Sequence, residues 1–236
     1  MIRHSEYGFE WELDEDPKKG QLGLLRENHY KSLFAPENRV RSFGFEDVWL
    51  DIGANIGAFA IRAAPLVQQV VAVEPDPEAY LQLVRNIELN GLLDTDKRLG
   101  KVYPLKGAVI GGPSKWVTLS RSNSYTSTHR LGRIRGRKTV EVAGLNINEL
   151  FRDYPINKIK MDCEGSEVEI LEGMSIENLE RLDEIIFEYH FAMLKDKNWS
   201  VFYSLLERLK RRGLTIVKQP AERTKTWHTI VWAKRL

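Results

Sequence analysis

Four apolar runs in this chain end in acidic side chains, and one of those ends also carries an imidazole. The residues concerned are Asp51, Glu74, Asp162, Glu164, Glu188 and His190. A carboxylate or an imidazole can take the proton from a reacting hydroxyl group. Several carboxylates around one cavity can instead hold Mg²⁺ or Mn²⁺, which lowers the pKa of a bound hydroxyl directly. These residue types therefore predict a site that activates a hydroxyl, either by general-base catalysis or through a metal ion.

The first of these acids opens a turn that is rich in small residues. From Asp51 to Gly57 the sequence reads D-x-G-x-N-x-G, and a second apolar run ends seventeen residues later at Glu74. Glycine lets the backbone come close to a ligand, and Asn55 tolerates unusual backbone angles. A carboxylate at the end of the second run can accept both hydroxyls of a ribose. The spacing predicts half of a nucleotide-binding unit, although a βα turn without a ligand is the alternative.

The spacing also separates classes of cofactor. No G-x-G-x-x-G and no G-x-x-x-x-G-K-[ST] occurs, so neither a dinucleotide site nor a P-loop is predicted. The pattern resembles the first motif of class I S-adenosylmethionine-dependent methyltransferases. That resemblance implies S-adenosylmethionine as the cofactor. The residues expected to bind it are Asp51, Gly53, Asn55, Gly57, Glu74, Pro75, Asp76, Ala108 and Asp162.

Composition narrows the class of protein. The 236 residues are 42% hydrophobic and carry a formal net charge of +2, which is too balanced to indicate a nucleic acid or a membrane as partner. A single cysteine, Cys163, excludes an internal disulfide and a cysteine-based metal cluster. No apolar run approaches the length of a membrane span, and the first residues lack the apolar core of a signal peptide. We expect a cytoplasmic protein.

The elements that must position these residues alternate along most of the chain. Residues 1–46 are predicted to be an extension with a strand or hairpin near Phe9–Leu13 and a short helix at 28–34, packed on the core or placed on the substrate side. Residues 47–236 are predicted to form one domain, with a substrate-loop insertion at about 111–142 that contains two strands, 116–119 and 139–142. The other predicted strands are 48–52, 70–73, 102–105, 158–161, 184–188, 214–217 and 229–233, and the helices are 56–66, 77–90, 147–151, 166–173 and 200–212.

This alternation indicates an α/β, Rossmann-like sheet of the class I methyltransferase kind, with helices on both faces. The sheet is expected to be mainly parallel, with one antiparallel strand near the C-terminus, because only a short polar loop joins the last two strands. Ligands of such sheets bind beyond the carboxyl ends of the strands. The strand-end acids should therefore face one crevice.

The segment Lys158–Glu167 has the strongest influence on the predicted chemistry. Enzymes that methylate amino groups of DNA bases carry a motif of the N-P-P-Y kind here, whereas this chain has an acidic cluster, which suits a hydroxyl. We expect His190 to be the base, with Asp162 and Glu188 positioning the hydroxyl. A metal ion would be held by Asp162, Glu164 and Glu188. The alternative is that Glu164 and Glu167 only stabilise a helix start, and that His190 is a surface residue.

With these motifs in place, the chain resembles the FkbM-type methyltransferases. The resemblance covers residues 47 to about 190 and rests on four segments: 51–57, Glu74-Pro75-Asp76, 162–167 and Glu188-Tyr189-His190. Residues 145–150 resemble a further short segment of the family, with Asn146 where Asp is commoner. The resemblance implies O-methylation, often of sugars and of glycosylated products.

The basic, hydroxyl-rich loop 120–138 lies where such enzymes build a substrate lid. Its side chains suit a phosphate or carboxylate on an acceptor, and they suit plain solvation equally well. The predicted substrate-binding residues are Glu164, Tyr125, His129, Arg130 and Arg133. A small molecule or a glycan is the favoured acceptor. The alternatives are an RNA methyltransferase that acts on the ribose 2′-hydroxyl, and a non-catalytic module that only binds S-adenosylmethionine.

Overall fold

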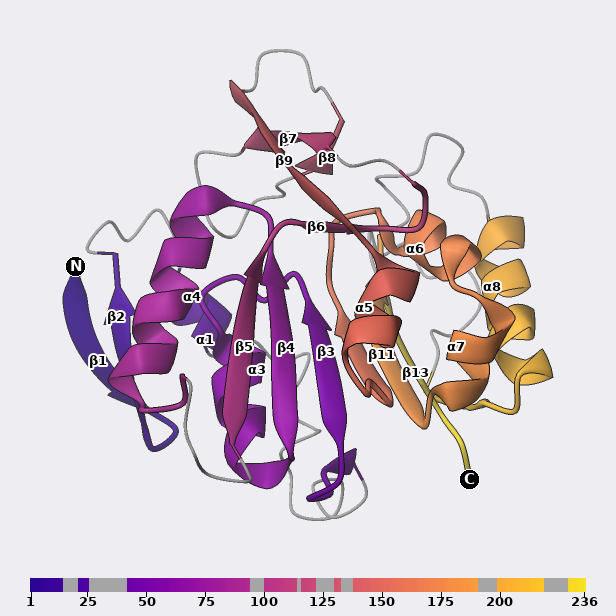
Figure 1. Cartoon of the computed structure of the whole chain (residues 1–236), viewed down its shortest axis with the longest axis horizontal. Coiled ribbons are helices and arrows are strands. Elements are labelled where there is room, and N and C mark those ends of the chain that lie inside the picture. Colours follow the sequence, from indigo (N-terminus) through magenta and orange to yellow (C-terminus); the bar gives the residue numbers. More distant parts are fainter. Residues whose placement is uncertain are drawn as a thin grey trace.

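A seven-stranded sheet forms the centre of the molecule (Figure 1). The computed structural model describes residues 1–14, 21–25, 42–93, 100–113, 116–121, 130–132, 138–190, 199–218 and 229–236. The strand order is β12-β13-β11-β10-β3-β4-β5. The bounds of these strands are β3 Val48–Ile52, β4 Gln69–Glu74, β5 Lys101–Lys106, β10 Lys158–Met161, β11 Glu184–Tyr189, β12 Thr215–Lys218 and β13 Thr229–Lys234.

Strand directions confirm the predicted fold class. The neighbours β5, β4, β3, β10 and β11 all pair in parallel. Strand β13 runs antiparallel to both β11 and β12, so it is the one reversed strand among the seven. Parallel neighbours require crossovers, and helices supply them here. The carboxyl ends of the parallel strands therefore share one edge of the sheet, which is where the site described below is built.

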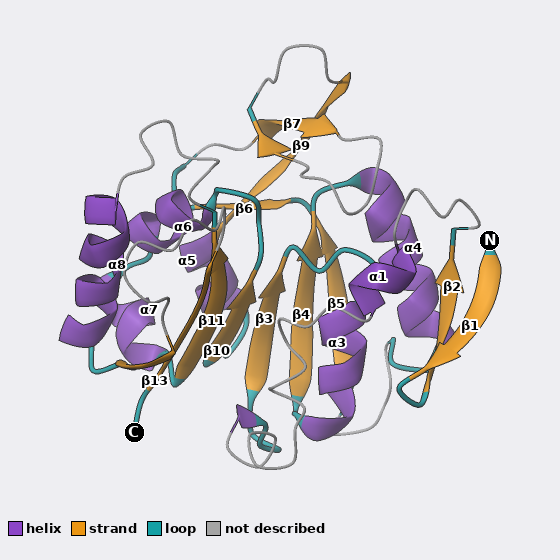
Figure 2. Cartoon of the chain, turned by 180° about the vertical axis from the view of Figure 1, so that it is seen from behind, coloured by secondary structure: helices purple, strands orange, loops and turns teal. Residues whose placement is uncertain are grey.

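Helices cover the two faces of the sheet because the buried strands alternate their side chains between them. Val48, Leu50 and Ile52 pack in one core, with side chains from α5 to α8. Trp49 packs in the other core, with side chains from α1, α3, α4 and β2. The helix bounds are α1 Gln21–Leu25, α3 Ala58–Ala63, α4 Pro77–Leu89, α5 Ile147–Asp153, α6 Glu167–Gly173, α7 Ile176–Arg181 and α8 Trp199–Arg211, and a 3₁₀ turn, Ala64–Leu66, follows α3. Figure 2 shows the arrangement from behind.

The ends of α4 follow from local sequence signals. The Asp76 side chain accepts hydrogen bonds from the backbone N–H groups of Glu78 and Ala79, so it is the N-cap, and Pro77 takes the first helical position. Gly91, at a φ of +63°, follows the C-cap residue Asn90. The predicted helix 77–90 is confirmed. By contrast, α1 and α7 are each short and were not predicted.

The N-terminal segment packs against α4 as a hairpin. Strands β1 (Ile2–Glu6) and β2 (Phe9–Leu13) pair antiparallel, and Trp11 is fully buried. The Asn86 side chain accepts a hydrogen bond from the Glu12 N–H at 2.7 Å, and the Asn90 amide donates one to the Glu10 carbonyl at 2.7 Å. The helix predicted at 28–34 lies outside the described residues.

A small second sheet rises beyond the carboxyl ends of the central strands (Figure 1). It has the order β6-β9-β7-β8, with bounds β6 Ala108–Ile110, β7 Trp116–Arg121, β8 Arg130–Leu131 and β9 Lys138–Asn146. The two strands predicted in this region correspond to β7 and β9, which pair antiparallel. We call this unit the inserted sheet. Its position places it over the edge at which the strand-end acids gather.

Among the described helices, none has both the length and the apolar character needed to cross a membrane.

Candidate functional site

The turn after β3 sits directly against the turn after β10. Gly53 has a φ of +76°, and a Cβ atom added to it would lie 1.9 Å from the backbone oxygen of Asp162. Asn55 and Gly57 also adopt positive φ, at 51° and 95°. A side chain at position 53 is therefore excluded by both conformation and space. The contact brings two motifs that are more than a hundred residues apart in the chain into one site.

Glu74 lies beside this turn, at the end of β4. Its side chain is almost fully buried, with the residue 5% exposed. The backbone N–H groups of Asn55 and Asp76 each donate to one of its oxygens at 2.8 Å. Burial raises the pKa of Glu74 to about 7, although the two hydrogen bonds oppose this shift. Each oxygen retains acceptor capacity, so the carboxylate can still receive ribose hydroxyls.

Asp51 forms a buried ion pair beneath the turn. Its residue is fully buried, and the Lys160 ammonium lies 3.0 Å from its Oδ1. Lys160 also donates to the Gly53 carbonyl at 3.1 Å. Burial raises the pKa of Asp51, while Lys160 opposes that shift. Lys160 was not predicted. The sequence did contain an indication of this ion pair: Lys160 lies within the predicted strand 158–161, and a buried lysine needs a partner of opposite charge.

Five ionisable side chains meet at the ends of β10 and β11, and we call them the acid–imidazole cluster: Asp162, Glu164, Glu167, Glu188 and His190. The imidazole Nδ1 of His190 lies 2.9 Å from Glu167 Oε1. Its Nε2 lies 3.3 Å from Glu164 Oε2, 3.8 Å from Asp162 Oδ1 and 3.9 Å from Glu188 Oε1. Glu167, Glu188 and His190 are all buried. The predicted catalytic and metal-ligating residues are therefore brought together.

The cluster controls the protonation of His190. Burial lowers the pKa of the imidazole, but the hydrogen bond and charge of Glu167, followed by Glu164 and Asp162, outweigh it and raise the pKa to about 10. At that pKa the imidazole holds a proton at neutral pH, so His190 must lose this proton before it can act as a base. The role of His190 as the base, with Asp162 and Glu188 as positioning groups, stays a prediction.

Glu167 is the member of the cluster whose role the sequence did not reveal. It lies in the first turn of α6, where an acid is also explained by the helix dipole. Its carboxylate receives the Cys163 N–H at 3.2 Å in addition to contacting His190. Only the three-dimensional contact with His190 distinguishes the two explanations.

The remaining residues predicted to bind the cofactor lie around the same edge. Ala108 begins β6 and is buried, and Pro75 is half-buried after β4. Asp76 is fully buried, and Arg121 of the inserted sheet reaches it with Nε at 2.5 Å. Arg121 Nη2 also lies 2.9 Å from Glu78. Asp76 thus joins the start of α4 to the inserted sheet.

We expect Arg121→Met to loosen the inserted sheet, because it leaves the buried Asp76 carboxylate without this cation. Losing hydrogen bonds to a charged group costs about 1.5–3 kcal/mol. Amide hydrogen exchange in β7 and β9 should therefore become faster, while exchange in β3 and β10 stays unchanged. Arg121→Lys keeps the charge and should show a smaller effect. Equal exchange in wild type and Arg121→Met would show that the ion pair does not hold the sheet in place.

Three of the predicted substrate-binding residues, Tyr125, His129 and Arg133, lie outside the described residues. Arg130 is described only as backbone, in β8. Glu164 is the one whose side chain the structure describes, and it belongs to the acid–imidazole cluster.

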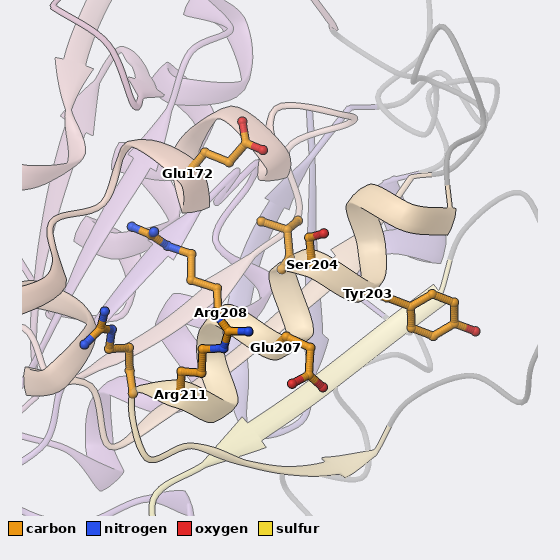
Figure 3. A pocket seen from close by; sticks show the side chains of 8 residues that line it. Glu172, Tyr203, Ser204, Glu207, Arg208 and Arg211 are labelled. Atoms are coloured by element: carbon orange, nitrogen blue, oxygen red, sulfur yellow. The ribbon is translucent and has the colours of Figure 1, made fainter.

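A surface pocket of about 520 Å³ lies elsewhere, along α8 (Figure 3). Glu172 of α6 lines it together with Tyr203, Glu207, Arg208 and Arg211. Acids and arginines are mixed in its walls, and no member of the acid–imidazole cluster lines it. We therefore place the site at the sheet edge and not in this pocket.

The parallel sheet with one reversed strand, the glycine turn and the strand-end acids together define the class I methyltransferase fold. The chain belongs to the family described as the methyltransferase FkbM domain, whose model matches residues 51–215. The predicted family resemblance is thereby confirmed.

Relatives are similar over part of their length. A hexuronic acid methyltransferase, AglP, from Haloferax volcanii is 27% identical over 146 residues, which are 61% of this chain and 56% of that protein. The methyltransferase sdnD from Sordaria araneosa is 28% identical over 171 residues, which are 59% of this chain and 64% of that protein. The chain thus spans less than two thirds of both relatives.

Solved structures share the fold at low identity. Trm5b from Pyrococcus abyssi superposes with a TM-score of 0.51 at 14% identity, covering 98% of this chain and 55% of that one. An rRNA methylase from Streptococcus thermophilus gives a TM-score of 0.50 at 12% identity, covering 86% of this chain and 97% of that one. At such identities the likeness concerns the fold alone.

Proposed function

We propose that this protein is an S-adenosylmethionine-dependent O-methyltransferase that acts on a hydroxyl of a sugar, a glycan or a glycosylated small molecule. The observation that carries the proposal is the contact between Gly53 and Asp162. This contact places the glycine-rich turn after β3, with Glu74 beside it, next to the acid–imidazole cluster. That cluster has groups that can accept the proton of a hydroxyl. A module that only binds the cofactor would need the first half of this site but not the second.

The cofactor would lie across the turn after β3. Glu74 would accept hydrogen bonds from its ribose hydroxyls, and the turn after β3, which Gly53 packs against the backbone of Asp162, would hold its amino acid end. Asp51 would support the turn without touching the cofactor. It is fully buried and pairs with Lys160, which donates a hydrogen bond to the Gly53 carbonyl. The methyl group would then face Asp162 and the rest of the acid–imidazole cluster.

The transfer itself is a substitution at the methyl carbon. The acceptor oxygen forms a bond to that carbon, the carbon–sulfur bond breaks, and its electron pair returns to sulfur. The products are a methyl ether, S-adenosylhomocysteine and one proton. We propose that Asp162 and Glu188 position the hydroxyl or a divalent ion, Mg²⁺ or Mn²⁺, and that His190, once its own proton has left, receives the proton of the hydroxyl.

An acidic sugar is the acceptor class that agrees both with the basic loop of this chain and with the name of one relative. The Haloferax relative is named for its action on a hexuronic acid. In this chain, loop 120–138 is rich in arginine, which pairs well with carboxylates. Glu164, Tyr125, His129, Arg130 and Arg133 remain the proposed acceptor contacts.

The experiment is a transfer assay with S-adenosylmethionine labelled on its methyl group. Panels of uronic acids, neutral sugars, nucleotide sugars, oligosaccharides and RNA serve as acceptors. Label in an alkali-stable ether on a sugar hydroxyl supports the proposal. Label on a ribose 2′-hydroxyl of RNA would replace it with the RNA alternative. Cofactor binding by calorimetry without transfer to any acceptor would favour the non-catalytic module.

We expect cofactor affinity to rise with pH through the pKa of Glu74, which is about 7. Below that pH the Glu74 carboxyl group is protonated. It must release this proton before it can accept hydrogen bonds from both ribose hydroxyls. Affinity should therefore increase from about pH 6 to about pH 8 and then level off, with proton release on binding below the pKa. Calorimetry in buffers of different ionisation enthalpy measures both quantities.

The matched variant is Glu74→Gln, which keeps the shape and removes the titration. Its affinity should be about ten- to a hundredfold weaker than that of wild type at pH 8, since a hydrogen bond to a charged group contributes about 1.5–3 kcal/mol. Its pH profile should be flat. A Glu74→Gln protein with wild-type affinity would place the ribose elsewhere.

A further inference from the structure

We propose that His190, Asp162 and Glu188 form a binding site for one divalent transition-metal ion, with Glu167 as the carboxylate that orients the imidazole. The catalytic role of this ion rests on the proposed function, but its binding does not. One ligand atom from each of the three residues can be chosen so that all lie within 4.8 Å of one another. The sequence predicted Asp162, Glu164 and Glu188 as metal ligands. In the present proposal the imidazole of His190 replaces the carboxylate of Glu164.

Of the three carboxylate oxygens around Nε2 of His190, Glu164 Oε2 lies at an ion-pair distance of 3.3 Å, and the other two lie at distances that suit ligands of one ion better than hydrogen-bond partners. Asp162 Oδ1 and Glu188 Oε1 lie 3.8 and 3.9 Å from Nε2, which is beyond hydrogen-bond length. Two ligands that each lie about 2.1 Å from a common ion are roughly 3–4.2 Å apart, depending on the angle between them. The three atoms thus need only a small inward movement to close on an ion.

Glu167 supplies the orientation that a metal-binding histidine requires. It lies 2.9 Å from the other ring nitrogen, Nδ1, and its residue is 1% exposed. A histidine that binds a metal ion almost always donates its second N–H to a carboxylate or a carbonyl. A proton held on Nδ1 by Glu167 leaves the lone pair of Nε2 directed toward Asp162 and Glu188. The carboxylate that contacts Nδ1 thus belongs to helix α6, whereas the proposed ligands lie at the ends of strands β10 and β11.

The mixture of donors selects the class of metal. Two carboxylates suit Mg²⁺ and Mn²⁺, whereas an imidazole favours transition metals over Mg²⁺. We therefore expect Mn²⁺ to bind more tightly than Mg²⁺. The ion and the proton on Nε2 exclude each other, because both need the same lone pair. An acceptor hydroxyl placed on the ion would lose its proton more easily, and Asp162 or Glu188 could pass that proton to water.

The test is Mn²⁺ binding to the whole chain, followed by electron paramagnetic resonance without any acceptor. We expect one ion per chain. The electron spin echo of bound Mn²⁺ should carry modulation from a directly bound nitrogen, and His190→Gln should abolish that modulation. Glu188→Gln should weaken binding at least tenfold. Glu167→Gln should weaken it about ten- to a hundredfold, the usual effect of losing the carboxylate behind a histidine ligand.

The matched control is Glu169→Gln, an exposed acid of the same helix as Glu167. It should bind Mn²⁺ as wild type does. Three results would each overturn the proposed site. They are equal weakening by Glu169→Gln and Glu188→Gln, bound Mn²⁺ without nitrogen modulation, and no binding of Mn²⁺ by wild type. Circular dichroism of every variant shows whether it is folded, and even where a variant unfolds, wild type that binds no Mn²⁺ or binds it without nitrogen modulation overturns the proposal.

The metal site and the proposed function can fail separately. Methyl transfer that persists after exhaustive treatment with EDTA would contradict the role of the ion and leave the methyltransferase intact. Bound Mn²⁺ with nitrogen modulation, but no transfer to any acceptor of the panel, would support the site and contradict the function. Transfer that EDTA abolishes and Mn²⁺ restores more fully than Mg²⁺ would support both.

Discussion

Lys160→Met is expected to lower the free energy of unfolding by about 3–5 kcal/mol, which is the usual cost of removing one partner from a buried ion pair. The Asp51 carboxylate would be left without its cation in a fully buried position, and the Gly53 carbonyl would lose a donor. Urea denaturation followed by circular dichroism measures the change.

Two controls separate the ion pair from general effects of the substitution. Lys210→Met removes an exposed lysine that pairs with Glu207, and it should cost less than about 1 kcal/mol. The double variant Lys160→Met with Asp51→Leu replaces both charges by apolar groups and should recover much of the lost stability. A double variant as unstable as Lys160→Met alone would show that the pair is not the source of the loss.

His190→Ala is expected to lower the turnover number by about 10²–10⁴ while leaving cofactor affinity unchanged. The imidazole contacts all four carboxylates of its cluster, and none of those contacts involves Glu74 or the turn after β3. The loss follows whether the imidazole handles the proton itself or holds a metal ion. Initial rates of S-adenosylhomocysteine formation with the acceptor found in the panel, together with calorimetry, measure both quantities.

His4→Ala is the matched control for this substitution. His4 lies in the N-terminal hairpin and pairs with Glu6, so its loss should leave the rate unchanged. A turnover number for His190→Ala within a few-fold of wild type would show that the chemical step takes place elsewhere. Weaker cofactor binding with an unchanged turnover number would move His190 to the cofactor half of the site.

The sequence alone determined the fold class and the edge of the sheet at which the candidate residues gather. Apolar runs that alternate with amphipathic segments define parallel strands and crossover helices from short-range periodicity. Parallel strands share one edge for their carboxyl ends, so Glu74, Asp162 and Glu188 had to gather there. Gly53 and Gly57 marked the turn because few other residues adopt their backbone angles.

Only the tertiary structure decided which side chain meets which. Glu167 and His190 are 23 residues apart, Asp76 and Arg121 are 45 apart, and Gly53 and Lys160 are 107 apart. Thirty-three acids and thirty-five bases allow many such pairings, and periodicity does not rank them. The selection comes from packing, because a buried charge must lie within a few ångströms of a partner, and only the folded chain fixes those distances. For the same reason the fold decided which carboxylates lie beside His190 and, against the opposing effect of burial, raise the pKa of its imidazole to about 10.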